Sequence, residues 1–78
     1  MTLLSITAVS RLAERHVRTY GPQPRADVIR WLERHGIDEE RAERGVEFAL
    51  IRNRLKRATR DDGEALLAGT TWPREAAA

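Results

Sequence analysis

The segment from Gly36 to Ala68 constrains the fold most, because its residue pattern changes at Asn53. Before that residue, apolar side chains recur at spacings of three and four, which is typical of an amphipathic helix. After it, a short basic stretch and an Asp-Gly signal predict a β-hairpin. Asparagine tolerates the left-handed backbone conformation, so Asn53 can end the helix where glycine usually does. We therefore expect a mainly α fold with a small β-hairpin, in the α+β class.

The helix in this segment is predicted over about residues 39–52. Asp38 is a good N-cap, and Glu39 and Glu40 complement the positive end of the helix dipole. A glycine inside a helix costs roughly 1 kcal/mol relative to alanine, so a helix neighbour, a partner chain or a phosphate should approach closely at Gly45. The apolar stripe of this helix consists of Ala42, Val46, Ala49 and Leu50.

Two earlier helices are predicted from the same periodicity. The first has Ser5 or Thr7 as its cap and ends at Gly21, and the second spans about residues 25–35 and ends at Gly36. The segment between them, GPQP, is expected to be a turn, because two prolines in three residues cannot continue a helix. The apolar residues at helical spacing are Ile6, Val9, Leu12, Ala13, Val17 and Tyr20 in the first helix, and Val28, Ile29 and Leu32 in the second.

The hairpin is predicted as a strand from Leu55 to Thr59 and a returning strand from Glu64 to Ala68, with turn residues at 61–63. The tail, residues 70–78, contains Trp72-Pro73, which can dock on the body of the protein. No internal repeat or long linker interrupts the chain. We therefore treat residues 1–78 as one domain with its core at about residues 5–69.

Composition limits the chain to one small core. It has 78 residues, of which 41% are hydrophobic and 33% are charged. A domain of this size usually has a net stability of only about 3–5 kcal/mol, so dimerisation or a bound partner can contribute noticeably. The absence of cysteine excludes disulfides, thiolate zinc sites and cysteine nucleophiles.

No candidate active site is evident in the sequence. His16 and His35 lie on different predicted helices, and the chain has no HExxH motif, P-loop or glycine-rich phosphate loop. Asp61 and Asp62 are best explained as turn residues before Gly63. We therefore expect no enzymatic activity, no cofactor, no metal site and no small-molecule substrate.

A membrane location is not expected. The first ten residues contain no basic segment before their apolar residues, and charged residues follow at once, so a signal peptide is not predicted. No stretch reaches the roughly 18 apolar residues that a membrane span needs. We expect a cytoplasmic protein.

Arginine dominates the basic residues: all but one of the 14 are arginine. Arginine can contact phosphate and guanine with two hydrogen bonds at once, which suits nucleic-acid binding. A GC-rich genome would also place arginine at solvated positions, so composition alone does not decide between the two explanations. The other face of the first helix carries Arg11, Glu14, Arg15 and Arg18. It is either a solvated face or, at Arg11 or Arg15, a secondary contact to phosphate.

The order of elements from Ala26 to Ala68 resembles the winged-helix family, in particular the winged-helix domains appended to archaeal replicative helicases and replication factors. The shared order is a helix, a Gly-Ile pair with acidic residues, a second helix, a glycine-like stop, a short basic strand and a turn with glycine. The residues that carry it are ADVIRWLERHGIDEERAERGVEFALIRNRLKRA. The resemblance implies a winged helix-turn-helix, with residues 39–52 as the recognition helix and the hairpin as the wing.

This resemblance also implies a small protein that binds duplex DNA and acts as a transcriptional regulator. Phosphate binding by such a protein would be electrostatic and dependent on salt. The candidate contacts on the recognition helix, at its end and on the wing are Arg41, Arg44, Arg52, Arg54, Lys56, Arg57 and Arg60.

An alternative is a winged helix for protein interaction or homodimerisation, acting as an adaptor in a larger assembly. The recognition helix carries four glutamates, at positions 39, 40, 43 and 47, which would repel a phosphate groove unless they pair with arginines. Phe48 and Ile51 lie on the face that would meet DNA. One explanation is that they form a partner interface together with Trp31. The other is that they are buried, covered either by the wing or by Trp72. These alternatives stay open, as does RNA in place of DNA.

Overall fold

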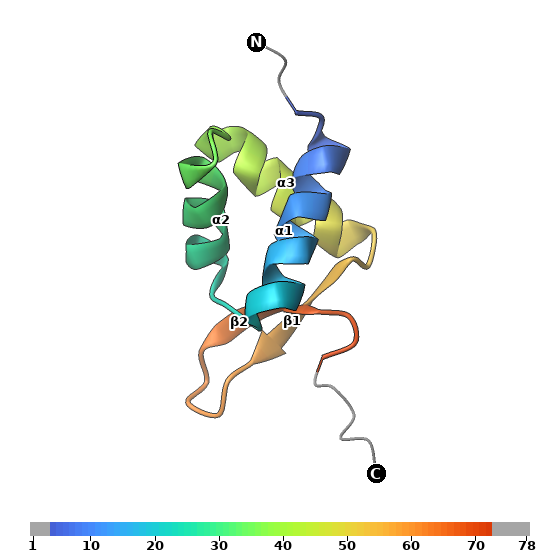
Figure 1. Cartoon of the computed structure of the whole chain (residues 1–78). Coiled ribbons are helices and arrows are strands. Elements are labelled where there is room, and N and C mark those ends of the chain that lie inside the picture. Colours follow the sequence, from blue (N-terminus) through green and yellow to red (C-terminus); the bar gives the residue numbers. More distant parts are fainter. Residues whose placement is uncertain (1–3, 73–78) are drawn as a thin grey trace.

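Three helices and a two-stranded antiparallel sheet form the part of the chain that the computed structural model describes, residues 4–72 (Figure 1). The helices lie on one side of the hairpin, and α1 crosses in front of α3 in the view of Figure 1. This is the predicted α+β layout, and it is consistent with a winged helix. The elements in chain order are α1 (Ile6–Tyr20), α2 (Arg25–Arg34), α3 (Glu39–Ile51), β1 (Leu55–Thr59) and β2 (Ala65–Gly69).

Side-chain caps begin α1 and α3. The Ser5 hydroxyl accepts a hydrogen bond from the backbone N–H of Ala8 at 3.1 Å, so Ser5 rather than Thr7 is the cap of α1. The Asp38 carboxylate accepts from the N–H of Arg41 at 3.2 Å. Each cap satisfies a backbone donor that the first turn of a helix leaves without a partner.

The same type of C-terminal motif ends α2 and α3. After α2, the N–H of Ile37 donates to the carbonyl of Leu32 at 3.2 Å, and Gly36 has a φ of 85°. After α3, the N–H of Arg54 donates to the carbonyl of Ala49 at 2.8 Å, and Asn53 has a φ of 57°. These are Schellman motifs, in which a left-handed residue lets the chain turn back on the last helical turn.

Each of these motifs makes the residue before the left-handed position a cap. His35 and Arg52 are therefore caps and not helical residues, and α2 and α3 end one residue earlier than predicted. The predicted left-handed roles of Gly36 and Asn53 are confirmed.

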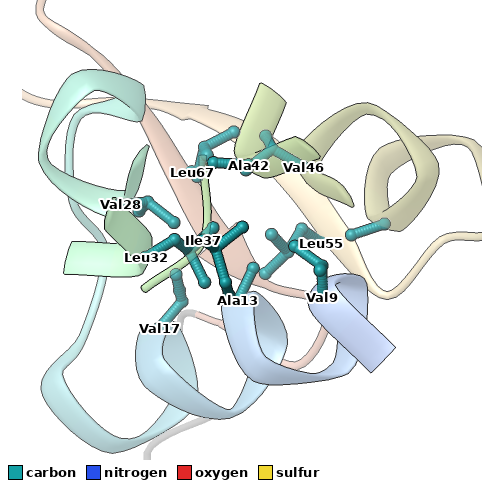
Figure 2. Packing of buried hydrophobic residues seen from close by; sticks show 11 residues of the cluster. Val9, Ala13, Val17, Val28, Leu32, Ile37, Ala42, Val46, Leu55 and Leu67 are labelled. Atoms are coloured by element: carbon teal, nitrogen blue, oxygen red, sulfur yellow. The ribbon is translucent and has the colours of Figure 1, made fainter. Parts of the chain in front are cut away.

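The core lies between the three helices and the sheet, and Figure 2 shows side chains from all of these elements pointing into it. Tyr20, which the spacing placed on the apolar face of α1, is 72% exposed because it lies at the helix end, beyond the core. The buried polar Ser10 on α1 donates its hydroxyl hydrogen to the carbonyl of Thr7 at 2.7 Å. The core residues are Val9, Ala13, Val17, Val28, Leu32, Ile37, Ala42, Val46, Ala49, Leu55 and Leu67.

Gly45 allows α1 to pack closely on α3. A Cβ atom added to Gly45 would lie 2.8 Å from the Cβ of Val9 and 3.3 Å from its carbonyl carbon. Atoms cannot approach that closely without a shift of the backbone. Among the three neighbours considered from the sequence, a helix is therefore the one that approaches Gly45.

The hairpin pairs Leu55 with Gly69 at its base and Thr59 with Ala65 near its turn. The returning strand therefore begins and ends one residue later than predicted. The turn closes with the N–H of Arg60 donating to the carbonyl of Glu64 at 2.8 Å, and Gly63 has a φ of 91°. Leu67 lies in the core and fixes which face of the hairpin meets the helices.

A short third segment joins the sheet at Gln23. Gln23 and Leu67 exchange backbone hydrogen bonds of 3.0 and 2.7 Å, an antiparallel bridge on the other side of β2 from β1. The sequence predicted only a turn here. A residue before proline is biased toward extended backbone, and Gln23 precedes Pro24, so the same prolines that stop the helix prepare Gln23 for pairing.

The last described residues fold back beside the end of α1. The N–H of Trp72 donates to the carbonyl of Gly69 at 3.0 Å, and the Trp72 side chain, 38% exposed, lines a hollow with Tyr20. Trp72 is thus partly docked, as the sequence suggested. Pro73 lies outside the described residues.

We expect Gly45→Ala to lower the free energy of unfolding by about 2 kcal/mol, because overpacking outweighs the gain of roughly 1 kcal/mol in helix propensity. Urea unfolding measures the change, and Glu43→Ala on the exposed face of α3 is the control. In a Val9→Ala background the same substitution should cost less. A Gly45→Ala protein more stable than the parent would contradict the close packing.

Candidate nucleic-acid and protein interfaces

The two arginines within α3 are already engaged by the protein. A guanidinium nitrogen of Arg44 lies 2.7 Å from the carboxylate of Glu40, one turn earlier. Arg41 donates to the backbone carbonyl of Leu4 at 2.7 Å and lies 3.8 Å from the carboxylate of Asp38. Arg41 therefore holds the segment before α1 against α3. A contact from either side chain to DNA would have to replace these interactions.

The outward face of α3 is acidic. Glu40, Glu43 and Glu47 surround one groove there, together with Arg44. Arg25 reaches across from the start of α2 and pairs with Glu47. The three carboxylates outnumber the two guanidinium groups, and this excess of negative charge repels phosphate.

An apolar strip runs through the same groove. Ile51 is 73% exposed, Phe48 is half-buried, and Ile6 from α1 completes the apolar lining of a cavity of about 400 Å³. The guanidinium carbon of Arg52 lies 5.1 Å from the centre of the Phe48 ring, within range of a cation–π interaction. Within residues 4–72, neither the hairpin nor Trp72 covers Ile51.

The hairpin divides its basic residues into two groups. Arg54 is half-buried and lies 3.9 Å from Glu14 on α1, and Arg60 lies 3.3 Å from Glu64 across the turn. Lys56 and Arg57 have no carboxylate within 4 Å in the described part of the chain. The positive charge of the hairpin is therefore on strand β1. Its turn instead exposes two acids, Asp61 and Asp62.

The outer face of α1 is the second surface with basic side chains that are not ion-paired. Arg11, Arg15 and Arg18 are exposed and follow each other at spacings of four and three, which places them on one face. No carboxylate among residues 4–72 lies within 4 Å of these three guanidinium groups. This spacing can be read from the sequence, but the sequence did not show that the arginines of α3 would be paired and those of α1 would not.

Trp31 belongs to a different surface from Phe48 and Ile51. Its ring stacks on His16 of α1, with centroids 4.1 Å apart, and lies 4.1 Å from the ring of His35. His16 is buried and shares a hydrogen bond of 3.0 Å with Gln23, so it ties α1 to the segment that pairs with β2. Both histidines thus pack against Trp31, and Trp31 does not line the groove of α3.

The described residues contain no group of three or more metal-binding side chains that could hold an ion. No helix within residues 4–72 combines the length and the apolar character that crossing a membrane requires.

Comparisons with protein-family models, with curated proteins and with solved structures found no match.

The exposure of Ile51 predicts a small effect on the stability of the isolated chain. At high dilution, Ile51→Ala should change the free energy of unfolding by less than about 0.5 kcal/mol. Leu55→Ala, at a residue that is 1% exposed, should lower it by about 2–5 kcal/mol. Urea unfolding of both variants makes the comparison. Equal losses would mean that Ile51 is covered in solution.

Proposed function

We propose that this protein binds duplex DNA through its phosphates, with strand β1 and the outer face of α1 as the contacting surfaces. The observation that carries the proposal is the distribution of charge. The exposed arginines of α1, exposed Arg57 and half-buried Lys56 are not ion-paired within the described chain, whereas Arg41 and Arg44 of α3 are. The side chains proposed to contact phosphate are Arg11, Arg15, Arg18, Lys56 and Arg57.

The physical basis is the release of counterions. A basic side chain that neutralises a phosphate releases condensed cations, so affinity falls steeply as salt rises. A side chain already paired with a carboxylate brings little net positive charge to the DNA. This difference separates Arg57 from Arg60 on the hairpin, and Arg15 from Arg44 on the helices.

The proposal changes the role of α3 from the one that the resemblance implies. Phosphate contacts position a protein on DNA but carry no sequence information. A role as a transcriptional regulator therefore needs base readout in addition. Arg52, at the C-terminal end of α3, has no carboxylate partner in residues 4–72 and is available for such a contact. The protein must be in the same compartment as the DNA that it binds, so the proposal includes a cytoplasmic location.

A second candidate function, protein interaction, is favoured by a different observation. The groove on α3 combines exposed Ile51 with half-buried Phe48 and with charges of both signs. This surface does not overlap the arginines of α1 or the basic residues of β1.

Binding of labelled mixed-sequence duplex DNA across a salt series tests the proposal. Replacing Lys56 and Arg57 together by glutamine should reduce the slope of log affinity against log salt by about 2, because each phosphate contact contributes about 1. Arg11→Gln, Arg15→Gln and Arg18→Gln together should reduce it by about 3.

The matched controls are Arg30→Gln and Arg44→Gln, which remove exposed arginines paired with carboxylates. Both should leave the slope nearly unchanged. The proposal is wrong if the parent protein shows no salt-dependent binding at low salt. It is also wrong if the control variants lose as much slope as the α1 and β1 variants.

A further inference from the structure

We propose that a single-stranded segment of DNA next to the duplex binds in a hollow at the C-terminal end of α1, with unpaired bases stacked on Tyr20 and Trp72. Arg18 lines the same hollow, and we call these three residues and the space between them the aromatic hollow. The inference rests on the proposed function, because the arginines of α1 would hold the DNA backbone beside this site.

The aromatic hollow joins two segments that are far apart in the sequence. Tyr20 ends α1 and Trp72 follows β2, and both line a cavity of about 580 Å³. Pockets for small ligands measure about 300–1,000 Å³, so the cavity is large enough for a nucleotide. Tyr20 is 72% exposed and Trp72 is 38% exposed, so both rings are accessible within residues 4–72. Phosphate binding by the arginines of α1 does not use either ring.

Gly69 at the end of β2 positions two of the three residues of the hollow. Its carbonyl accepts the hydrogen bond from the N–H of Trp72 at 3.0 Å. A Cβ atom added to Gly69 would lie 3.3 Å from the Cγ atom of Arg18, so the absence of a side chain lets the stem of Arg18 pack against the strand. The guanidinium group of Arg18 is thereby held at the same end of the sheet as the Trp72 ring.

The charge around the hollow suits a polyanion. No acidic side chain lines the hollow among residues 4–72. Arg18 and Thr19 also line a second hollow farther along α1, together with Arg15 and Glu14. Glu14 lies 3.9 Å from Arg54, so its negative charge is opposed by that guanidinium group. The basic face of α1 therefore continues into the aromatic hollow through Arg18.

The combination of aromatic rings with a row of arginines favours a single strand. Inside a duplex the faces of each base are covered by the neighbouring base pairs, whereas an unpaired base can stack on an aromatic side chain. Proteins that bind single strands combine such rings with basic side chains along the backbone. A proline-rich peptide also binds grooves lined by aromatic residues, but it has no phosphates for the arginines to contact.

A comparison of DNA tails with and without bases tests the proposal on the parent protein. The first DNA is a duplex with a short single-stranded thymidine tail, at the 3′ or the 5′ end. The second has an abasic tail of the same length, so the number of phosphates is equal. The thymidine tail should raise the affinity about fivefold or more over the abasic tail, because base stacking on aromatic side chains is the only added contact.

Variants of the two aromatic residues locate the site. Tyr20→Leu and Trp72→Leu keep an apolar side chain but remove the ring, and each should lose most of the gain from the thymidine tail. Tyr20→Phe and Trp72→Phe should keep it. Ile51→Ala, at an exposed apolar residue outside the hollow, is the matched control and should also keep it. Binding of the blunt duplex and its salt slope should be unchanged in all five variants, since none removes a charge.

Equal affinities for the thymidine and abasic tails at both ends would overturn the proposal, as would a gain that persists in both leucine variants. Binding of a polyproline peptide that depends on Trp72, with no gain from the thymidine tail, would assign the hollow to a protein partner instead. Salt-dependent binding of the blunt duplex without any gain from the tail would leave the phosphate contacts of α1 and β1 standing. A gain from the tail without binding of the blunt duplex would support the hollow and overturn the duplex proposal.

Discussion

The close packing of α1 on α3 is the constraint on which the rest of the structure depends. Gly45 has no side chain, so Val9 can lie directly against the α3 backbone. This approach sets which stripe of α3 is buried and therefore which side chains it leaves outward. Phe48, Ile51 and the glutamates face away from the core because Ala42, Val46 and Ala49 face α1 and the sheet.

The C-terminal end of α3 determines where the hairpin lies relative to the helices. Asn53 in the left-handed conformation turns the chain, and the hydrogen bond from Arg54 to Ala49 fixes the direction in which β1 leaves. The ion pair between Arg54 and Glu14 then connects the start of the hairpin to α1. Gln23, in the segment between α1 and α2, pairs with Leu67 on the other side of β2. Both strands of the hairpin are therefore attached to the helices.

Pairing among charged residues, more than their number, distinguishes the surfaces. Net charge is only +2, and acidic and basic residues alternate along much of the chain. On α3 and around the turn, arginines pair with carboxylates and acidic groups remain in excess, whereas Arg11, Arg15 and Arg18 of α1 and Lys56 and Arg57 of β1 have no carboxylate within 4 Å in residues 4–72. The basic surfaces proposed to contact phosphate, on α1 and β1, are therefore separate from the acidic groove on α3.

The sequence by itself determined the element order, the cap at Asp38, and the left-handed turns at Gly36 and Asn53, because these depend on neighbouring residues along one segment. It left the cap of α1 open between Ser5 and Thr7, and the structure identifies Ser5. The tertiary structure decided what depends on residues far apart: the bridge between Gln23 and Leu67, the neighbour of Gly45, and the attachment of Arg41 and Arg54. Helical spacing placed Phe48 and Ile51 outward, but only packing showed Ile51 uncovered within the described chain. Periodicity reports which residues share a face; which faces meet is set by contacts between elements.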